Sequence, residues 1–203
     1  MSGAKLPLAV IAGTLITGLV STIAQAADLS AVPSGSYTVD PTHAYIHVQY
    51  NHLGLSNPIL AFNEFSVDMD LNNAEPSKTS VSVDIKADSI ITGSDIFNQH
   101  ITGEKWFDTG ANPAITFSSQ SVTANDDGTF ALMGDLTIKG MTKPVTLDVT
   151  INAAMKHPLK KTPVVGISAV GNLNRSDWGL GGNAPYISDE VKLEIQAEMF
   201  KSE

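Results

Sequence analysis

The sequence predicts an all-β fold, an antiparallel barrel of about eight strands that carries one short helical insertion. Three observations indicate this fold. Apolar residues recur at every second position through most of the chain, turn-forming residues separate these runs, and one segment departs from the pattern with helical spacing. The 203 residues are enough for one domain with a sizeable core.

The alternation of apolar and polar residues is clearest in residues 190–199, where Val191, Leu193 and Ile195 alternate with charged or polar neighbours. The same period of two occurs at residues 145–151, 81–86 and 46–51, and turn signals lie between such runs at residues 72–73, 125–128, 139–140 and 179–182. One apolar face and one polar face are typical of an antiparallel sheet that is wetted on one side.

One predicted strand, residues 59–71, changes phase. Leu60 and Phe62 fall on one face, whereas Phe65 and Val67 fall on the other. An extra residue near Asn63 would produce this change as a β-bulge, which is the usual means of bending a strand into a barrel.

The segment from Ser89 to Gly110 is the predicted helical insertion. Ser94 can accept hydrogen bonds from the first backbone amides of a helix, and Gly103 can end it. Ile96, Phe97, His100 and Ile101 then fall on one helical face. We expect this short helix to cap an open end of the barrel.

Residues 1–26 differ from the rest of the chain and have the three parts of a secretory signal. Lys5 gives a positive start, an apolar run follows, and Ala24-Gln25-Ala26 forms a small-residue cleavage site. A transmembrane anchor is the alternative, because the run approaches the ~20 residues that span a bilayer. We expect cleavage near Ala26 and a periplasmic location.

The mature chain would then consist of a linker, residues 27–35, and the barrel domain, residues 36–203. It would hold 11 basic and 21 acidic residues, because only Lys5 is lost, and its formal charge would be −10. Such a surface repels phosphate backbones and anionic lipid headgroups. We therefore expect no nucleic acid partner and no stable membrane insertion after cleavage. The chain has no Cys, which excludes disulfides and Cys-ligated metals.

No catalytic or metal-binding pattern stands out, and we expect no cofactor and no metal. His43 and His47 would share a strand face, but no nearby carboxylate falls on that face to complete a set of metal ligands. There is no Gly-x-Ser-x-Gly motif of the kind that presents a nucleophilic serine. The apolar and aromatic residues can form a filled core, or they can surround one small ligand.

Several short motifs in order resemble the YceI-like family, exported or cytosolic lipocalin-like barrels that bind polyisoprenoids. The motifs include Asp40-Pro-Thr-His43, residues 46–54, residues 87–95, Trp106-Phe107-Asp108 and residues 134–145, and Arg175-Ser-Asp-Trp-Gly179 follows them. The resemblance covers about residues 36–201, which is nearly all of the chain after the signal. It implies a lipocalin-like barrel with an apolar interior that holds a polyisoprenoid, such as a polyprenyl phosphate or an isoprenoid quinone.

The resemblance and the alternation together predict the residues that contact this ligand. The apolar candidates are inward-facing residues of the strands and of the helix: Ile46, Val48, Tyr50, Phe65, Val67, Val83, Ile85, Phe97, Ile101, Phe117, Leu136, Ile138, Leu147, Val149, Ile167 and Trp178. The candidates for a polar mouth are Asp95, His100 and Arg175, and Arg175 is preferred if the headgroup is a phosphate, because a guanidinium binds phosphate through two hydrogen bonds.

Two other functions stay open at this stage. An enzyme acting on a lipid or isoprenoid derivative would place titratable groups inside the barrel, whereas the predicted inward positions are almost all apolar. A stress-related interaction protein would have a filled barrel without a cavity of ligand size. A non-enzymatic binding protein is the preferred interpretation, and the sequence leaves open whether it forms a homodimer.

Overall fold

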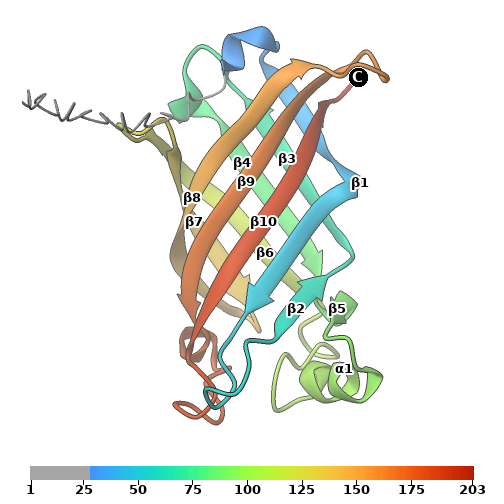
Figure 1. Cartoon of the computed structure of the whole chain (residues 1–203), viewed down its shortest axis with the longest axis vertical. Coiled ribbons are helices and arrows are strands. Elements are labelled where there is room, and N and C mark those ends of the chain that lie inside the picture. The colour runs from blue at the N-terminus through green and yellow to red at the C-terminus, as the bar shows by residue number, and fades with distance from the viewer. Residues whose placement is uncertain (1–27) are drawn as a thin grey trace, which may run out of the picture.

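The computed structural model describes residues 28–203, and the predicted signal peptide lies outside them. Figure 1 shows a tall barrel with a short helix at one end and the C-terminus at the other. The strands are β1 (Gly35–Gln49), β2 (Ile59–Phe62), β3 (Phe65–Leu71), β4 (Ser80–Lys86), β5 (Ile90–Ile91), β6 (Ala114–Ala124), β7 (Phe130–Ile138), β8 (Met141–Lys156), β9 (Pro163–Asn174) and β10 (Glu190–Lys201).

All strand pairs are antiparallel and join neighbours in the order β10-β9-β8-β7-β6-β4-β3-β1-β2-β5. The additional pairing of β1 with β10 closes the sheet on itself. Because β2 and β3 pair with successive parts of β1, they act as one interrupted strand, and the barrel is eight strands around. The prediction of an antiparallel barrel of about eight strands with a helical insertion is confirmed.

The phase change predicted near Asn63 appears as a break between β2 and β3. The chain leaves the sheet at residues 63–64, and the strand resumes at Phe65 with pairing to β4. A further irregularity lies on β1, where the register with β10 shifts between Val39 and Ala44. Such irregularities bend long strands, and β8 with 16 residues would otherwise extend roughly 50 Å.

The turn signals read from the sequence coincide with hairpins. Between β7 and β8, Lys139 and Gly140 both have positive φ, at 51° and 71°, which is the geometry of a two-residue type I′ turn. Glycine adopts this geometry without strain, so the pair fixes the register in which Ile138 lies opposite Met141.

The helical insertion is α1 (Asp95–Thr102), which begins after the predicted cap. Ser94 Oγ accepts a hydrogen bond from Phe97 N at 3.4 Å, and Gly103 ends the helix. Phe97 and Ile101 pack against the core, whereas Ile96 is exposed, so its predicted place on the apolar face is wrong. Within residues 28–203, no helix has the length and apolar character needed to cross a bilayer.

Four short 3₁₀ helices complete the fold: η1 (Leu29–Ala31), η2 (Pro76–Lys78), η3 (Ala87–Ser89) and η4 (Arg175–Trp178). The first of them lies in the segment interpreted as a linker. Its Leu29 and the following Val32 are buried, together with Tyr37, in a core cluster at the end of the barrel that also holds the C-terminus (Figure 1). Residues 29–32 therefore form part of the barrel floor.

Candidate functional site

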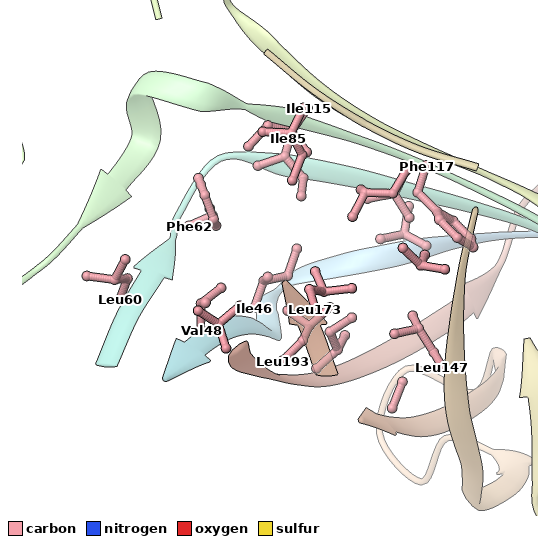
Figure 2. A pocket seen from close by; sticks show the side chains of 18 of the residues that line it. Ile46, Val48, Leu60, Phe62, Ile85, Ile115, Phe117, Leu147, Leu173 and Leu193 are labelled. Carbon is pink, nitrogen blue, oxygen red and sulfur yellow. The ribbon is translucent and has the colours of Figure 1, made fainter. Parts of the chain in front are cut away.

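A cavity of about 750 Å³ runs along the interior of the barrel. Its lining extends from Leu29 and Pro76 at one end to His52 and Ile187 at the other, and all eight strand positions of the barrel contribute to it. Figure 2 shows apolar side chains of several strands, among them Ile46 and Leu147, projecting into this space. No Asp, Glu or Lys belongs to the lining formed by the described residues.

The alternating pattern of the strands produces this lining. On β8, Val145, Leu147, Val149 and Ile151 line the cavity, and the polar residues between them face outward. Successive side chains on a strand point to opposite faces, so a closed sheet of such strands has an apolar interior. The period of two that is visible in the sequence thus becomes the wall of the cavity.

Two glycines keep large side chains against the wall. A Cβ placed on Gly134 would lie 2.4 Å from Phe117 Cζ, and a Cβ on Gly171 would lie 2.7 Å from Leu147 Cδ2. The ring of Phe117 therefore lies over Gly134 on the neighbouring strand, and the Leu147 side chain lies over Gly171. Without these glycines, both side chains would be displaced from the wall.

The cavity opens at the α1 end of the barrel. The lining residues that are themselves exposed to solvent are Ser56, His100 and Asn183, and all three belong to the helix or to loops at this end. At the opposite end the floor is made by buried residues, including Leu29 and Val165. The polar groups of the site are accordingly concentrated around one mouth.

Arg175, the only arginine in the sequence, lies at this mouth and holds the loop between β9 and β10. Its Nε donates to Ser188 O at 2.7 Å, one terminal nitrogen donates to Leu180 O, and the other donates to Ile187 O at 3.0 Å. Both terminal nitrogens also lie within hydrogen-bond distance of Gly182 O. The five donors of the guanidinium are thus occupied by backbone carbonyls.

The charge of Arg175 is partly buried. Burial lowers the pKa of the guanidinium from its usual value, while the Asp189 carboxylate and Tyr50 oppose that shift. Burial likewise raises the pKa of the Tyr50 phenol, and the nearby Arg175 opposes it. Both groups keep their ordinary protonation at neutral pH, so the mouth offers one cation and a neutral phenol.

Aromatic side chains surround the same mouth. Trp106 Nε1 donates to His100 Nε2 at 3.1 Å, and the two rings meet edge to face. The guanidinium of Arg175 lies 6.0 Å from the ring of Trp106, and Phe97 packs beside His100. Because His100 Nε2 accepts this hydrogen bond, the neutral imidazole carries its hydrogen on Nδ1.

Most predicted contact residues line the cavity, and two do not. Phe65 and Asp95 are outside the lining: Phe65 packs at the wall beside Glu64 and Pro113, and Asp95 is the exposed first residue of α1. The predicted residues that do line the cavity are Ile46, Val48, Tyr50, Val67, Val83, Ile85, Phe97, His100, Ile101, Phe117, Leu136, Ile138, Leu147, Val149, Ile167, Arg175 and Trp178.

Sequence reasoning missed two groups of lining residues. One group lies on strands and follows the same alternation, which could have identified it; it includes Leu60, Phe62, Met69, Ile115, Leu132, Val145, Leu173, Val191 and Leu193. The other group lies in loops, where no periodic signal exists, and includes His52, Ser56, Asn183 and Ile187.

The fold places two carboxylates near His43, so the expectation that none is available there is wrong: Asp40 lies three residues earlier on β1, and Glu198 lies on the neighbouring β10. The exposed His43 has its Nδ1 3.3 Å from Oδ2 of the buried Asp40 and 4.0 Å from Glu198 Oε2. Lys160 Nζ lies 2.6 Å from the same Asp40 oxygen. An ammonium group of the protein already occupies the position where a cation would bind, so we assign no metal to this cluster.

Three comparisons place the chain among known proteins. Residues 37–199 match the family described as YceI-like domain. The UPF0312 protein SAB2563 of Staphylococcus aureus is 32% identical over 174 residues, covering 83% of this chain and 99% of that protein.

Among solved structures, BcnA of Burkholderia cenocepacia has a TM-score of 0.70 at 22% identity, covering 79% of this chain and 98% of BcnA. A polyisoprenoid binding domain from Saccharophagus degradans, implicated in plant cell wall breakdown, has a TM-score of 0.61 at 13% identity, covering 84% and 100%. At these identities, the structural likeness establishes the shared fold.

Proposed function

Because the chain belongs to the YceI-like domain family, we propose that its barrel is a periplasmic binding or carrier protein for a long-chain hydrophobic ligand. The ligand class we propose is a polyisoprenoid, such as a polyprenyl phosphate or an isoprenoid quinone. The observation that carries the proposal is the apolar cavity of about 750 Å³ with its single polar mouth. This volume is within the range of ~300–1,000 Å³ typical of ligand pockets.

The affinity for such a chain would come from burial of hydrocarbon. Each buried methylene contributes roughly 0.8 kcal/mol, so one isoprene unit contributes a few kcal/mol before the cost of ordering the chain. Several units along the barrel would therefore make release slow without any special polar contact. The polyisoprenoid binding domain with the same fold supports this ligand class.

The headgroup would lie at the mouth, among the side chains of Tyr50, His52 and His100. Arg175 was preferred from the sequence for a phosphate, but its five donors are held by carbonyl groups of the β9–β10 loop. A phosphate could form a bidentate pair of hydrogen bonds with Arg175 only if that loop opened. Arg175 therefore offers the headgroup a positive field and no free hydrogen bond.

An enzymatic function is disfavoured by the same cavity. General acid–base catalysis needs a positioned titratable group at the reacting atoms. In the part of the chain described here, the titratable lining groups are Tyr50, His52, His100 and Arg175 at the mouth, and the deeper wall is apolar. The filled barrel of an interaction protein does not fit a cavity of this volume.

A pair of substitutions on β8 tests the proposal. Val149→Trp would fill the middle of the cavity, whereas Thr150→Trp places the same ring on the outer face of the neighbouring position. Lipids extracted from the protein purified from its native host would be identified by mass spectrometry. Binding of an added prenylated quinone would be followed by quenching of Trp106 and Trp178, both of which line the cavity.

We expect the unaltered protein and the Thr150→Trp variant to carry an isoprenoid and to bind the quinone. The Val149→Trp variant should lose most of both while remaining folded, because its new ring occupies empty space. Absence of any copurified isoprenoid, together with no quenching by the quinone, would reject the proposed function. Equal binding by both variants would show that the ligand lies elsewhere.

A further inference from the structure

Exposed apolar side chains gather around the mouth of the cavity. Six exposed large apolar residues of α1, β2, β5 and the β1–β2 and β9–β10 loops form what we term the apolar rim: Leu53, Leu55, Ile59, Ile91, Ile96 and Tyr186. The most exposed are Ile96 at 83% and Leu55 at 81%. At the opposite end, Leu159 at 84% is the one large apolar residue of comparable exposure among residues 28–203.

The rim is assembled from segments that contact one another. Leu53 N donates to Tyr186 O at 3.0 Å, which joins the β1–β2 loop to the β9–β10 loop. Ile91 on β5 pairs with Ala61 on β2. Ile59 lies two residues before Ala61 and therefore shares the outer face of the sheet with Ile91. Figure 1 shows β2, β5 and α1 together with both loops at the same end of the barrel.

The loops of the rim also lack charge. Residues 51–59 and 180–188 contain no Asp, Glu, Lys or Arg, and α1 contains Asp95 alone. The loops at the other end differ: residues 125–129 include two Asp, and residues 157–162 include two Lys. Apart from Asp95, the rim carries no charge whose desolvation would oppose its removal from water.

We infer that the apolar rim docks reversibly on the surface of a phospholipid bilayer with electrically neutral headgroups, so that the mouth of the cavity faces the membrane. The inference rests on the proposed function, because a water-insoluble chain resides in a bilayer and must leave it through the mouth. Leu and Ile side chains at loop and helix tips can enter the headgroup region, and Tyr186 suits the interface itself.

Charge selects the lipid surface. The chain has a net charge of −9, and an anionic bilayer would repel it. A neutral bilayer allows the uncharged rim to approach, while the acidic wall of the barrel stays in water. The contact is peripheral, since six side chains around an opening cannot span the hydrocarbon core.

Vesicles of phosphatidylcholine provide the test, with binding measured by cosedimentation. The variants Leu55→Asp and Ile96→Asp change the two most exposed rim residues, and neither side chain lines the cavity. Leu159→Asp is the matched control, because it makes the same change at equal exposure on the opposite end. Mass spectrometry of each intact purified protein establishes whether residues 1–26 are present.

We expect the unaltered protein to sediment with the vesicles and each rim variant to partition at least about tenfold less. Each variant lacks one aliphatic side chain that would be buried in the bilayer on docking. The Leu159→Asp variant should bind as the unaltered protein does. Rim variants that still bind equally, for instance through an uncleaved N-terminal segment, would overturn the inference.

Failure of vesicle binding by every protein would also overturn it. If the unaltered protein were then a dimer in analytical ultracentrifugation and the rim variants were monomers, the rim would be an interface between two copies. Quenching by the prenylated quinone, measured without vesicles, tests the proposed ligand separately. Loss of quenching in all proteins, with vesicle binding still dependent on the rim, would reject that ligand and support the docking surface.

Discussion

The two ends of the barrel differ in how far their apolar side chains are exposed to solvent. At the floor, Tyr37 and Val165 have no exposed surface, and Met199 is almost as inaccessible. At the mouth, Leu55 and Ile96 are largely surrounded by water. The floor is a packed core in which Leu29 of the N-terminal η1 clusters with buried residues of β1, β3, β9 and β10. The mouth is an arrangement of loops and one helix around an opening.

The floor of the barrel contributes mainly to the stability of the fold, and the mouth provides the route for a ligand. The buried cluster at the floor closes the barrel by excluding water, which is the main source of folding free energy. The mouth buries fewer of its loop residues, among them Trp178 and Leu180, and the hydrogen bonds of Arg175 also hold its β9–β10 loop. Loops held by hydrogen bonds open at lower cost than a packed core, so a ligand would pass through the mouth.

Two tyrosines, one at each end, give the largest expected difference. Tyr37→Ala removes a fully buried ring and the hydrogen bond of its hydroxyl to Pro33 O at 2.6 Å, so the free energy of unfolding should fall by about 3–5 kcal/mol. Tyr186→Ala, at 73% exposure, should change it by less than about 0.5 kcal/mol. Chemical denaturation measures the free energy of unfolding of both variants. Equal losses of that free energy would contradict the distinction between floor and mouth.

The hydrogen bonds of Arg175 are the next target. Arg175→Lys keeps the charge but loses at least two of the bonds to loop carbonyls, so we expect a loss of about 2 kcal/mol in stability. Amide hydrogen exchange should accelerate in residues 180–188 and stay unchanged in β8. Lys139→Gln is the control, because Lys139 makes one exposed bond to Glu104 O. Unchanged exchange in the loop would mean that Arg175 does not hold it.

Strands were predictable because their signal is local and repeated. Alternating residues on β8 and β10 indicate both the sheet and its inward face, so part of the cavity wall could be identified from the sequence. The phase change near Asn63 was visible for the same reason. Its form, a break into β2 and β3, depends on pairing with distant strands that the sequence does not display.

The mouth was harder to predict because its residues come from loops. Asp95 was a candidate for the polar mouth, yet it lies at the start of α1 and outside the cavity lining. The place of Arg175 was indicated, but its partners are backbone carbonyls, which no side-chain pattern reveals. The prediction for Ile96 was wrong because helical periodicity alone cannot tell whether a neighbouring element covers a given face.

Ion pairs at the two ends provide the smallest expected difference. Asp40 is buried near the floor, and its hydrogen bonds with Lys160 and Thr42 hold the pKa of its carboxyl well below the usual value. Because the folded pKa is lowered, this contribution is present above about pH 4 and is lost as the pH falls further. Asp40→Asn should therefore reduce stability at pH 7 by about 1–2 kcal/mol, since Lys160 is half exposed to solvent.

The same substitution should flatten the decline in unfolding free energy between pH 4 and pH 2, as measured by urea titrations across this range. Glu64→Gln is the counterpart toward the mouth, where Glu64 pairs with Lys86 at 3.3 Å and both side chains are exposed. Salt and water screen that pair, so its removal should leave both the stability and its pH dependence nearly unchanged. An acid response that is identical in all three proteins would mean that Asp40 keeps its ordinary pKa, and that the floor is stabilised by apolar packing alone.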